Sequence, residues 1–175
     1  MKNTIKFIAI EAINTSARVI FMTFLGAFLS FSALSKDNIA DVTVKDAWVR
    51  TTVPGQKGTG AFMSITAKSD LHLVGASSAV AGVTEVHEMK MNGDIMQMRA
   101  VSGLDLPAGK VLALQPGGFH VMLLDLKTAL PKNTTVPLTL LFKDAKGMQS
   151  KVDLMVPVAT TAPSGAAAPM NQHKH

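Results

Sequence analysis

Short runs of alternating apolar and polar residues follow one another along most of this chain, and they constrain its fold more than any other feature. In 41–50, apolar side chains at Val42, Val44 and Trp48 alternate with polar ones, as in a strand with one buried face. Pairs containing Pro, Gly, Asn or Asp separate the runs, and no segment has the period of a long helix. Nine strands are predicted, at 41–50, 60–67, 71–76, 83–91, 95–101, 110–114, 120–126, 136–142 and 148–156. Their spacing predicts an all-β domain, an antiparallel Greek-key sandwich or barrel.

The composition excludes several classes of protein. The chain has 175 residues, 47% of them hydrophobic, which is enough for one packed core. It has no cysteine, so disulfides, thiolate nucleophiles, a blue-copper centre and an acylated lipoprotein cysteine are not expected. The net charge is only +5, no basic run occurs and Trp48 is the only tryptophan, so nucleic-acid binding is not expected either.

The first 35 residues have the organisation of an export signal. The leader is basic, with Lys2, Lys6 and Arg18, and an uncharged apolar run of 13 residues follows at 19–31. Small residues at the minus-three and minus-one positions, Ala33 and Ser35, then provide a cleavage site after residue 35. Because a transmembrane helix needs about 20 apolar residues, no stable membrane span is expected after cleavage. The length of the leader leaves an uncleaved anchor as the alternative.

The C-terminal end differs in composition from the rest. Residues 159–169 are rich in Ala, Pro, Ser and Thr, which predicts a flexible linker. The linker leads to potential metal ligands at Met170, His173 and His175. The predicted organisation is therefore a signal peptide at 1–35, a folded domain at 36–158, and a linker with a Met/His tail at 159–175.

A dense group of methionines surrounds an Asn-Gly pair at 92–93, and this pair predicts a tight hairpin. A type I′ loop formed by the pair joins positions whose numbers sum to 185, which places His87 directly opposite Met98. Side chains alternate between the two faces of a strand. One face of the hairpin is therefore expected to carry His87, Met89, Met96 and Met98.

A second histidine–methionine couple follows a glycine turn. His120 and Met122 are two residues apart in a predicted strand, so they share a face. Two facing couples would supply two nitrogen and two sulfur donors. Neutral thioethers suit Cu(I) and do little for Zn²⁺, Mg²⁺ or Ca²⁺. The predicted ligands are His87, Met98, His120 and Met122, with Met89 and Met96 as accessory donors.

The same residues resemble a known signature. The spacing His87-x10-Met98-x21-His120-x-Met122 is similar to that of the periplasmic copper chaperones of the PCu(A)C type. The resemblance extends over about 42–157 and includes AWVR at 47–50, GAFMSI at 60–65, PAG at 107–109 and PGGFH at 116–120. It implies a periplasmic, cupredoxin-like β-barrel that binds one Cu(I) through those four side chains.

The resemblance also has departures and extensions. Some family members have a methionine directly after the first histidine, where this chain has Glu88, so no fifth ligand is expected there. Other relatives carry a His- and Met-containing C-terminal extension that holds Cu(II) or a second copper. Met170, His173 and His175 resemble a short version of it, and a solvated tail without a role is the alternative.

The resulting prediction is a monomeric periplasmic Cu(I) metallochaperone and not an enzyme. The resemblance implies delivery toward cytochrome c oxidase assembly, with an oxidase subunit or a Sco-type thiol protein as the recipient. Copper storage or resistance through the same site is one alternative. An exported β-sandwich interaction module whose methionines are only core is another. The sequence contains no nucleophile elbow, Walker-type loop or HExxH motif.

Overall fold

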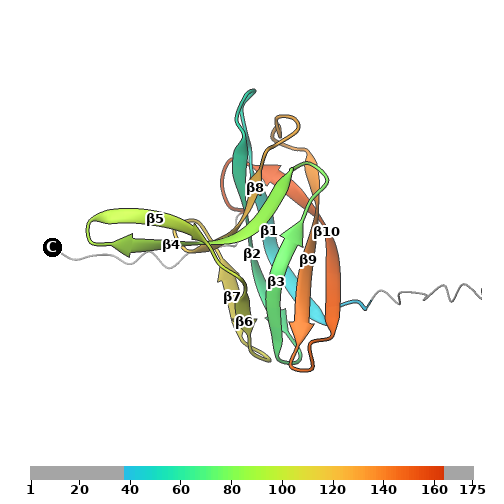
Figure 1. The fold of residues 1–175 in the computed structure, drawn as a ribbon. Helices are drawn as coiled ribbons and strands as arrows, with labels where there is room; N and C mark the ends of the chain where they lie inside the picture. The colour runs from blue at the N-terminus through green and yellow to red at the C-terminus, as the bar shows by residue number, and fades with distance from the viewer. Residues whose placement is uncertain (1–37, 164–175) are drawn as a thin grey trace, which may run out of the picture. The chain divides into compact units, whose positions relative to one another are not determined.

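The computed structural model describes residues 38–163, in which ten β-strands and no helix occur (Figure 1). The predicted signal peptide and the tail residues Met170, His173 and His175 lie outside this range. Among residues 38–163 there is no candidate for a membrane-spanning helix. The strands are β1 (Val42–Arg50), β2 (Gly58–Ala67), β3 (Leu71–Ser77), β4 (Val83–Asn92), β5 (Ile95–Ala100), β6 (Leu104–Leu106), β7 (Val111–Leu114), β8 (Phe119–Leu124), β9 (Thr135–Asp144) and β10 (Gln149–Ala159).

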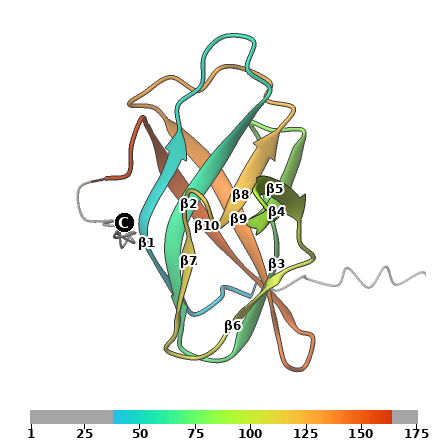
Figure 2. The same cartoon turned by 90° about the vertical axis from the view of Figure 1, so that its left-hand side faces the viewer.

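The all-β prediction is confirmed, and nine of the ten strands coincide with predicted runs to within a few residues. The sequence reading missed β6 because three residues are too few to show an alternation. The strands form one hydrogen-bonded path in the order β5-β4-β8-β2-β1-β10-β9-β3-β6, with β7 beside β2. In Figure 2, β1, β2 and β8 lie on one side of the domain and β3, β9 and β10 pack across from them.

One strand pairing departs from the antiparallel prediction. Val49 and Arg50 of β1 pair in parallel with Val158 and Ala159 of β10, whereas the pairings between the other named strands are antiparallel. An isolated bridge between Ile39 and Lys151 is also parallel. These two strands come from opposite ends of the domain, so no hairpin fixes their relative direction. The contact connects the two halves of the strand path.

Alternation along the strands separates a core face from an outer face. On β8, Val121 and Leu123 are completely buried in the core. Burial of such side chains stabilises the fold by about 1.5–3 kcal/mol each. His120 and Met122 occupy the alternate positions and therefore point to the outer face. The core thus determines which face of β8 carries the candidate donors.

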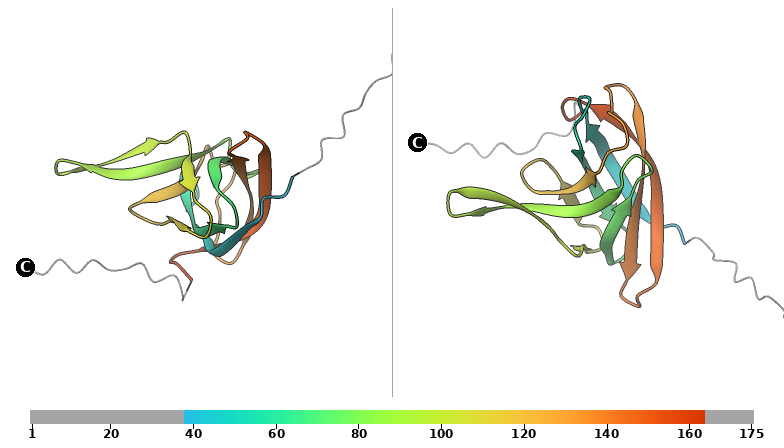
Figure 3. Two further views of the ribbon diagram at one scale, coloured as in Figure 1. Left: turned by 90° about the horizontal axis from the view of Figure 1, so that it is seen from below. Right: turned by 45° about the horizontal axis from the view of Figure 1, so that its top comes forward.

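The hairpin of β4 and β5 extends away from the other strands, as Figures 1 and 3 show. Strand pairing between β4 and β8 ends at Glu88 and Phe119. Beyond that point β4 pairs with β5 alone. We call residues 89–98 of this two-stranded ribbon the arm.

The register predicted for the hairpin was wrong by two positions. Paired residue numbers sum to 187, so Met98 lies opposite Met89, and His87 lies opposite Ala100. The loop consists of residues 93–94, with a positive φ of 63° at Gly93 and none at the next residue. That is the φ pattern of a type II′ turn, which needs glycine only at its first central position, whereas type I′ needs two positive φ angles. Because the register differs by an even number of residues, His87, Met89, Met96 and Met98 still lie on one face of the hairpin, as predicted.

Candidate metal centre

Three neighbouring strands bring the candidate donors together on the outer face. His87 of β4 is the direct partner of His120 of β8, and their ring centroids are 6.0 Å apart. Glu85, two residues before His87 on β4, lies opposite Met122, two residues after His120 on β8. Met122 in turn pairs with Gly60 of β2. Because directly opposed residues share a face, these side chains gather in one region.

His120 is almost completely buried, and each of its ring nitrogens has one neighbour. Nδ1 lies 3.1 Å from the carbonyl oxygen of Gly118, and Nε2 lies 3.3 Å from the Sδ atom of Met98. Since a carbonyl oxygen only accepts hydrogen bonds, the neutral ring carries its proton on Nδ1 and donates it to Gly118. Nε2 then directs a lone pair toward the thioether sulfur. The predicted imidazole–thioether couple therefore exists, but its histidine is His120 and not His87.

The separation of these two atoms suits a shared cation. With bonds of about 2.0 Å to nitrogen and about 2.3 Å to sulfur, as in zinc sites, tetrahedral donors lie roughly 3.5 Å apart. The 3.3 Å between Nε2 of His120 and Sδ of Met98 is close to that value. A metal ion bound by both atoms would therefore lie to one side of the line that joins them, at the apex of the nitrogen–metal–sulfur angle.

The pKa of His120 lies below its ordinary value of 6.5. Burial is the main cause, because it disfavours the charged ring. The hydrogen bond to Gly118 opposes this change, while the positive charge of Arg50, and that of His87 when its ring is protonated, lower the pKa further. The neutral ring is the form that binds a metal, so the surroundings of His120 favour the binding form.

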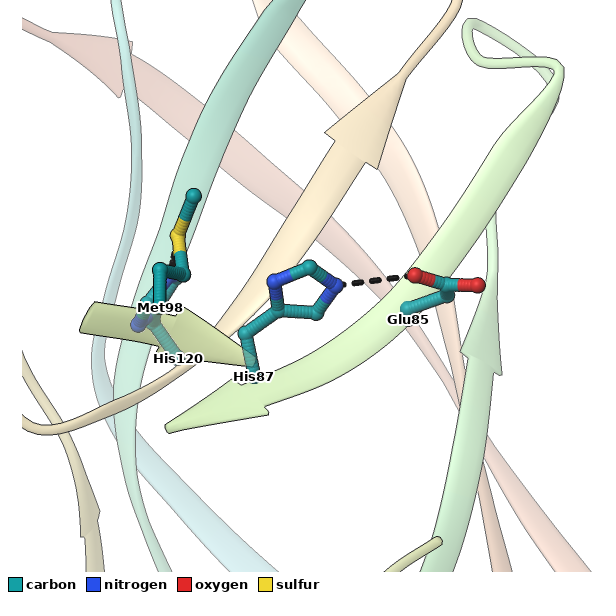
Figure 4. Close-up of polar contacts among 4 residues, drawn as sticks. All are labelled: Glu85, His87, Met98 and His120. Carbon is teal, nitrogen blue, oxygen red and sulfur yellow. Dashed lines mark hydrogen bonds and ion pairs between the residues drawn. The ribbon is translucent and has the colours of Figure 1, made fainter. Parts of the chain in front are cut away.

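His87 has a complementary arrangement. Its Nε2 atom lies 2.8 Å from a carboxylate oxygen of Glu85, so the neutral ring carries its proton on Nε2. Its Nδ1 atom is buried and has no hydrogen-bond partner. In Figure 4, the ring edge opposite Glu85 faces Met98 and His120. Carboxylate and carbonyl acceptors commonly hold metal-binding histidines in one tautomer, and here each histidine keeps one nitrogen free.

A cavity of about 260 Å³ lies beside His120. Three predicted ligands, Met98, His120 and Met122, line it together with the predicted accessory residue Met89. His87 is not part of this lining, and Met96 lies further out on the arm, where it is half exposed. No group of three or more His, Cys, Asp or Glu side chains that could hold a metal occurs among residues 38–163. The donor set in the cavity thus combines nitrogen with methionine sulfur.

Two side chains that sequence reasoning did not assign to the site, Phe62 and Arg50, also line the cavity. The ring of Phe62 lies 6.1 Å from that of His120 and 4.7 Å from that of Trp48, and the guanidinium of Arg50 lies 5.5 Å above it. Gly60 makes room for this ring, because a Cβ atom there would lie 2.6 Å from Phe62. Alternation could show that Trp48 and Arg50 share a face, but not that β2 brings them beside β8. Phe62 thus packs beside His120, and Arg50 places a positive charge near it.

Comparison with known proteins places the chain in a family. Residues 42–158 match the family model described as "Putative lipoprotein LpqE-like". The chain belongs to the LpqE-like family. A relative of this LpqE-like protein, "Putative lipoprotein Lxx21020" of Leifsonia xyli subsp. xyli (strain CTCB07), is 33% identical over 137 residues. The match covers 77% of this chain and 82% of the relative.

Solved structures with a similar fold include PCuAC domains. The apo PCuAC domain from PmoF1 has a TM-score of 0.56 at 22% identity, covering 71% of this LpqE-like chain and 98% of that domain. The solution structure of CuI-DR1885 from Deinococcus radiodurans has a TM-score of 0.51 at 27% identity, covering 75% and 83% of the two chains. These likenesses confirm the resemblance to PCu(A)C-type proteins and the cupredoxin-like β fold.

Proposed function

We propose that this LpqE-like protein is a periplasmic carrier that binds Cu(I) through His87, Met98, His120 and Met122 and hands it to a recipient protein. The main support for this proposal is that Nε2 of His120 lies 3.3 Å from Sδ of Met98. The Nδ1 atom of His87, whose ring neighbours that of His120, has no hydrogen-bond partner. The similar Deinococcus protein is described in its CuI form, which supports the choice of metal.

The chemistry of the donors favours the cuprous ion. Imidazole nitrogen and thioether sulfur are neutral, and thioethers are soft ligands that select Cu(I). Neutral donors leave the positive charge of the ion in place. Met89 lines the same cavity and gives the site another sulfur that can replace a donor during exchange. Such a set suits an ion that is held, then released.

The recipient and location are further parts of the proposal. A thiolate-containing acceptor of the Sco type binds Cu(I) more strongly than thioethers do, because thiolate is soft and charged. Transfer of Cu(I) toward cytochrome c oxidase assembly is then favourable, because each acceptor binds the ion more tightly than this protein does. The lipoprotein descriptions of the family and relative support export.

The test of the proposed function combines affinity with ligand identity. Cu(I) is titrated into the reduced protein against a chromogenic chelator, and X-ray absorption then identifies the atoms around copper. Both nitrogen and sulfur ligands are expected, and a shell of oxygen alone would refute the site. Loss of oxidase activity in a deletion strain at low copper would support delivery, whereas copper sensitivity with intact oxidase would show sequestration.

Protons should compete with Cu(I) for the two imidazoles. Affinity is expected to fall as the pH is lowered, since each histidine must be neutral to bind. Because burial lowers the pKa of His120, the loss of Cu(I) affinity that is due to protonation of His120 should occur below pH 6.5.

Arg50→Gln removes a positive charge near His120 and should raise the midpoint of the His120 titration, measured by NMR on the metal-free protein. An unchanged midpoint would contradict this electrostatic role of Arg50.

Glu85 should act on copper through His87. Glu85→Ala removes the acceptor that holds the His87 proton on Nε2, so Cu(I) affinity should fall by about 10–100-fold. Glu85→Gln keeps an oxygen that can accept this hydrogen bond, so Cu(I) affinity should fall less than in Glu85→Ala. Nitrogen NMR of His87 distinguishes this positioning role from general destabilisation, since the tautomer should change only in Glu85→Ala. Equal affinity in all three proteins would argue against it.

A further inference from the structure

The arm carries more sulfur than the proposed site uses. Met89 pairs across the strands with Met98, and Met91 pairs with Met96 one step nearer the turn. The pairs form two thioether rungs on one face, separated by about 7 Å along the strands. Met89 and Met98, which we call the inner rung, line the cavity beside His120. Met91 and Met96, which we call the outer rung, lie outside that lining.

The two faces of the arm differ in chemistry. Met91 and Met96 on one face are 53% and 52% exposed. The other face carries Lys90, Gln97 and the one branched aliphatic side chain of the arm, Ile95. Strands favour β-branched and aromatic residues, and any of these would make an apolar surface. Methionine at every position of one face therefore indicates a use for sulfur itself.

The ribbon is built to hold the outer rung in place. At its base, Arg99 of β5 forms a salt bridge of 2.7 Å with Glu88 of β4. Near the turn, the side-chain amide of Asn92 donates to Gln97 at 3.3 Å. Both contacts join the strands on the face opposite the methionines, so they do not engage the sulfur atoms of Met91 and Met96.

We propose that Met91 and Met96 form a second, weaker Cu(I) site through which the ion reaches or leaves the centre beside His120. Directly opposed side chains have Cβ atoms about 4.5–5.5 Å apart, and two flexible thioethers at that distance can close on one soft ion. The inner rung supplies the next sulfurs. The outer rung binds more weakly because it offers two donors in water. The identity of the ion rests on the proposed function.

The test is an anaerobic Cu(I) titration of the protein, followed through the methionine methyl resonances. The wild-type protein should bind two ions, the weaker of which shifts the methyl signals of Met91 and Met96. The variant Met91→Leu, Met96→Leu keeps the apolar volume and should lose only the weaker ion. The control variant Met148→Leu, Met155→Leu replaces exposed methionines outside the arm and should keep both ions.

Two results would overturn the second site: a single ion in the wild-type protein, or two unchanged ions in Met91→Leu, Met96→Leu. The variant His120→Ala, Met122→Ala separates this proposal from the proposed function. If its tight ion survives, the assignment of the main site fails. Shifts of the Met91 and Met96 methyl signals in that same variant would still support the outer rung.

Discussion

In the His120→Ala, Met122→Ala variant, Cu(I) affinity should fall by about 100-fold or more, exceeding the 10–100-fold loss typical of residues that only support a metal ligand. The variant removes one nitrogen and one sulfur from a cavity in which few other donors remain. Met98 would keep its sulfur but lose the imidazole that lies 3.3 Å from it. Chelator competition on the reduced protein measures the change.

A second variant separates ligand loss from loss of structure. His120 is buried, so truncation to alanine leaves a void that can destabilise the domain. His120→Gln, Met122→Leu keeps most of the volume and should lose a similar part of the affinity. Circular dichroism and thermal unfolding would show that both variants are folded. Wild-type copper retention in either folded variant would exclude these side chains as ligands.

The face on which each donor lies could be predicted because it depends on local geometry alone. Strand side chains alternate with a period of two, so His120 and Met122 had to share a face once β8 was recognised. The same rule placed Met89 and Met98 together. The error in register changed partners by an even number of residues and so left the faces intact.

The neighbours of each strand could not be predicted in this way. β8 lies between β4 and β2, and only this order places His87 opposite His120. Long-range packing of core residues such as Val86 and Val121 determines the order, and local propensity does not contain it. The spacing resemblance named the four candidate donors, but not which imidazole would lie beside Met98.

Turn type and hydrogen-bond partners depend on details finer than a residue pattern. The pair at 92–93 is compatible with more than one tight turn, and only the φ angles show that the loop is 93–94. Nothing in the sequence distinguishes Glu85 from a surface carboxylate. Its role becomes visible only when one rotamer brings it 2.8 Å from the His87 ring.

Phe142→Ala should lower the free energy of unfolding by about 3–5 kcal/mol, the usual cost of deleting a buried aromatic side chain. Phe142 is completely buried on β9, where it pairs with Leu73 of β3 and Ser150 of β10. The control is Leu141→Ala on the outward face of the same strand, where Leu141 is partly exposed, and it should cost less than about 1 kcal/mol. Urea unfolding measures both values, and equal losses would contradict the packing of β9.

Copper should partly restore the stability of Phe142→Ala, because a ligand that binds only the folded state stabilises it by mass action. At free Cu(I) 100 times the dissociation constant, the gain is about 2.7 kcal/mol. Phe142 belongs to the core cluster and is absent from the cavity lining, so the gain should match that of the wild-type protein. No gain in Phe142→Ala, with a full gain in the wild-type protein, would show that the core and the metal centre are coupled. An equal gain would show that the fold positions the donors without the core residue taking part in binding.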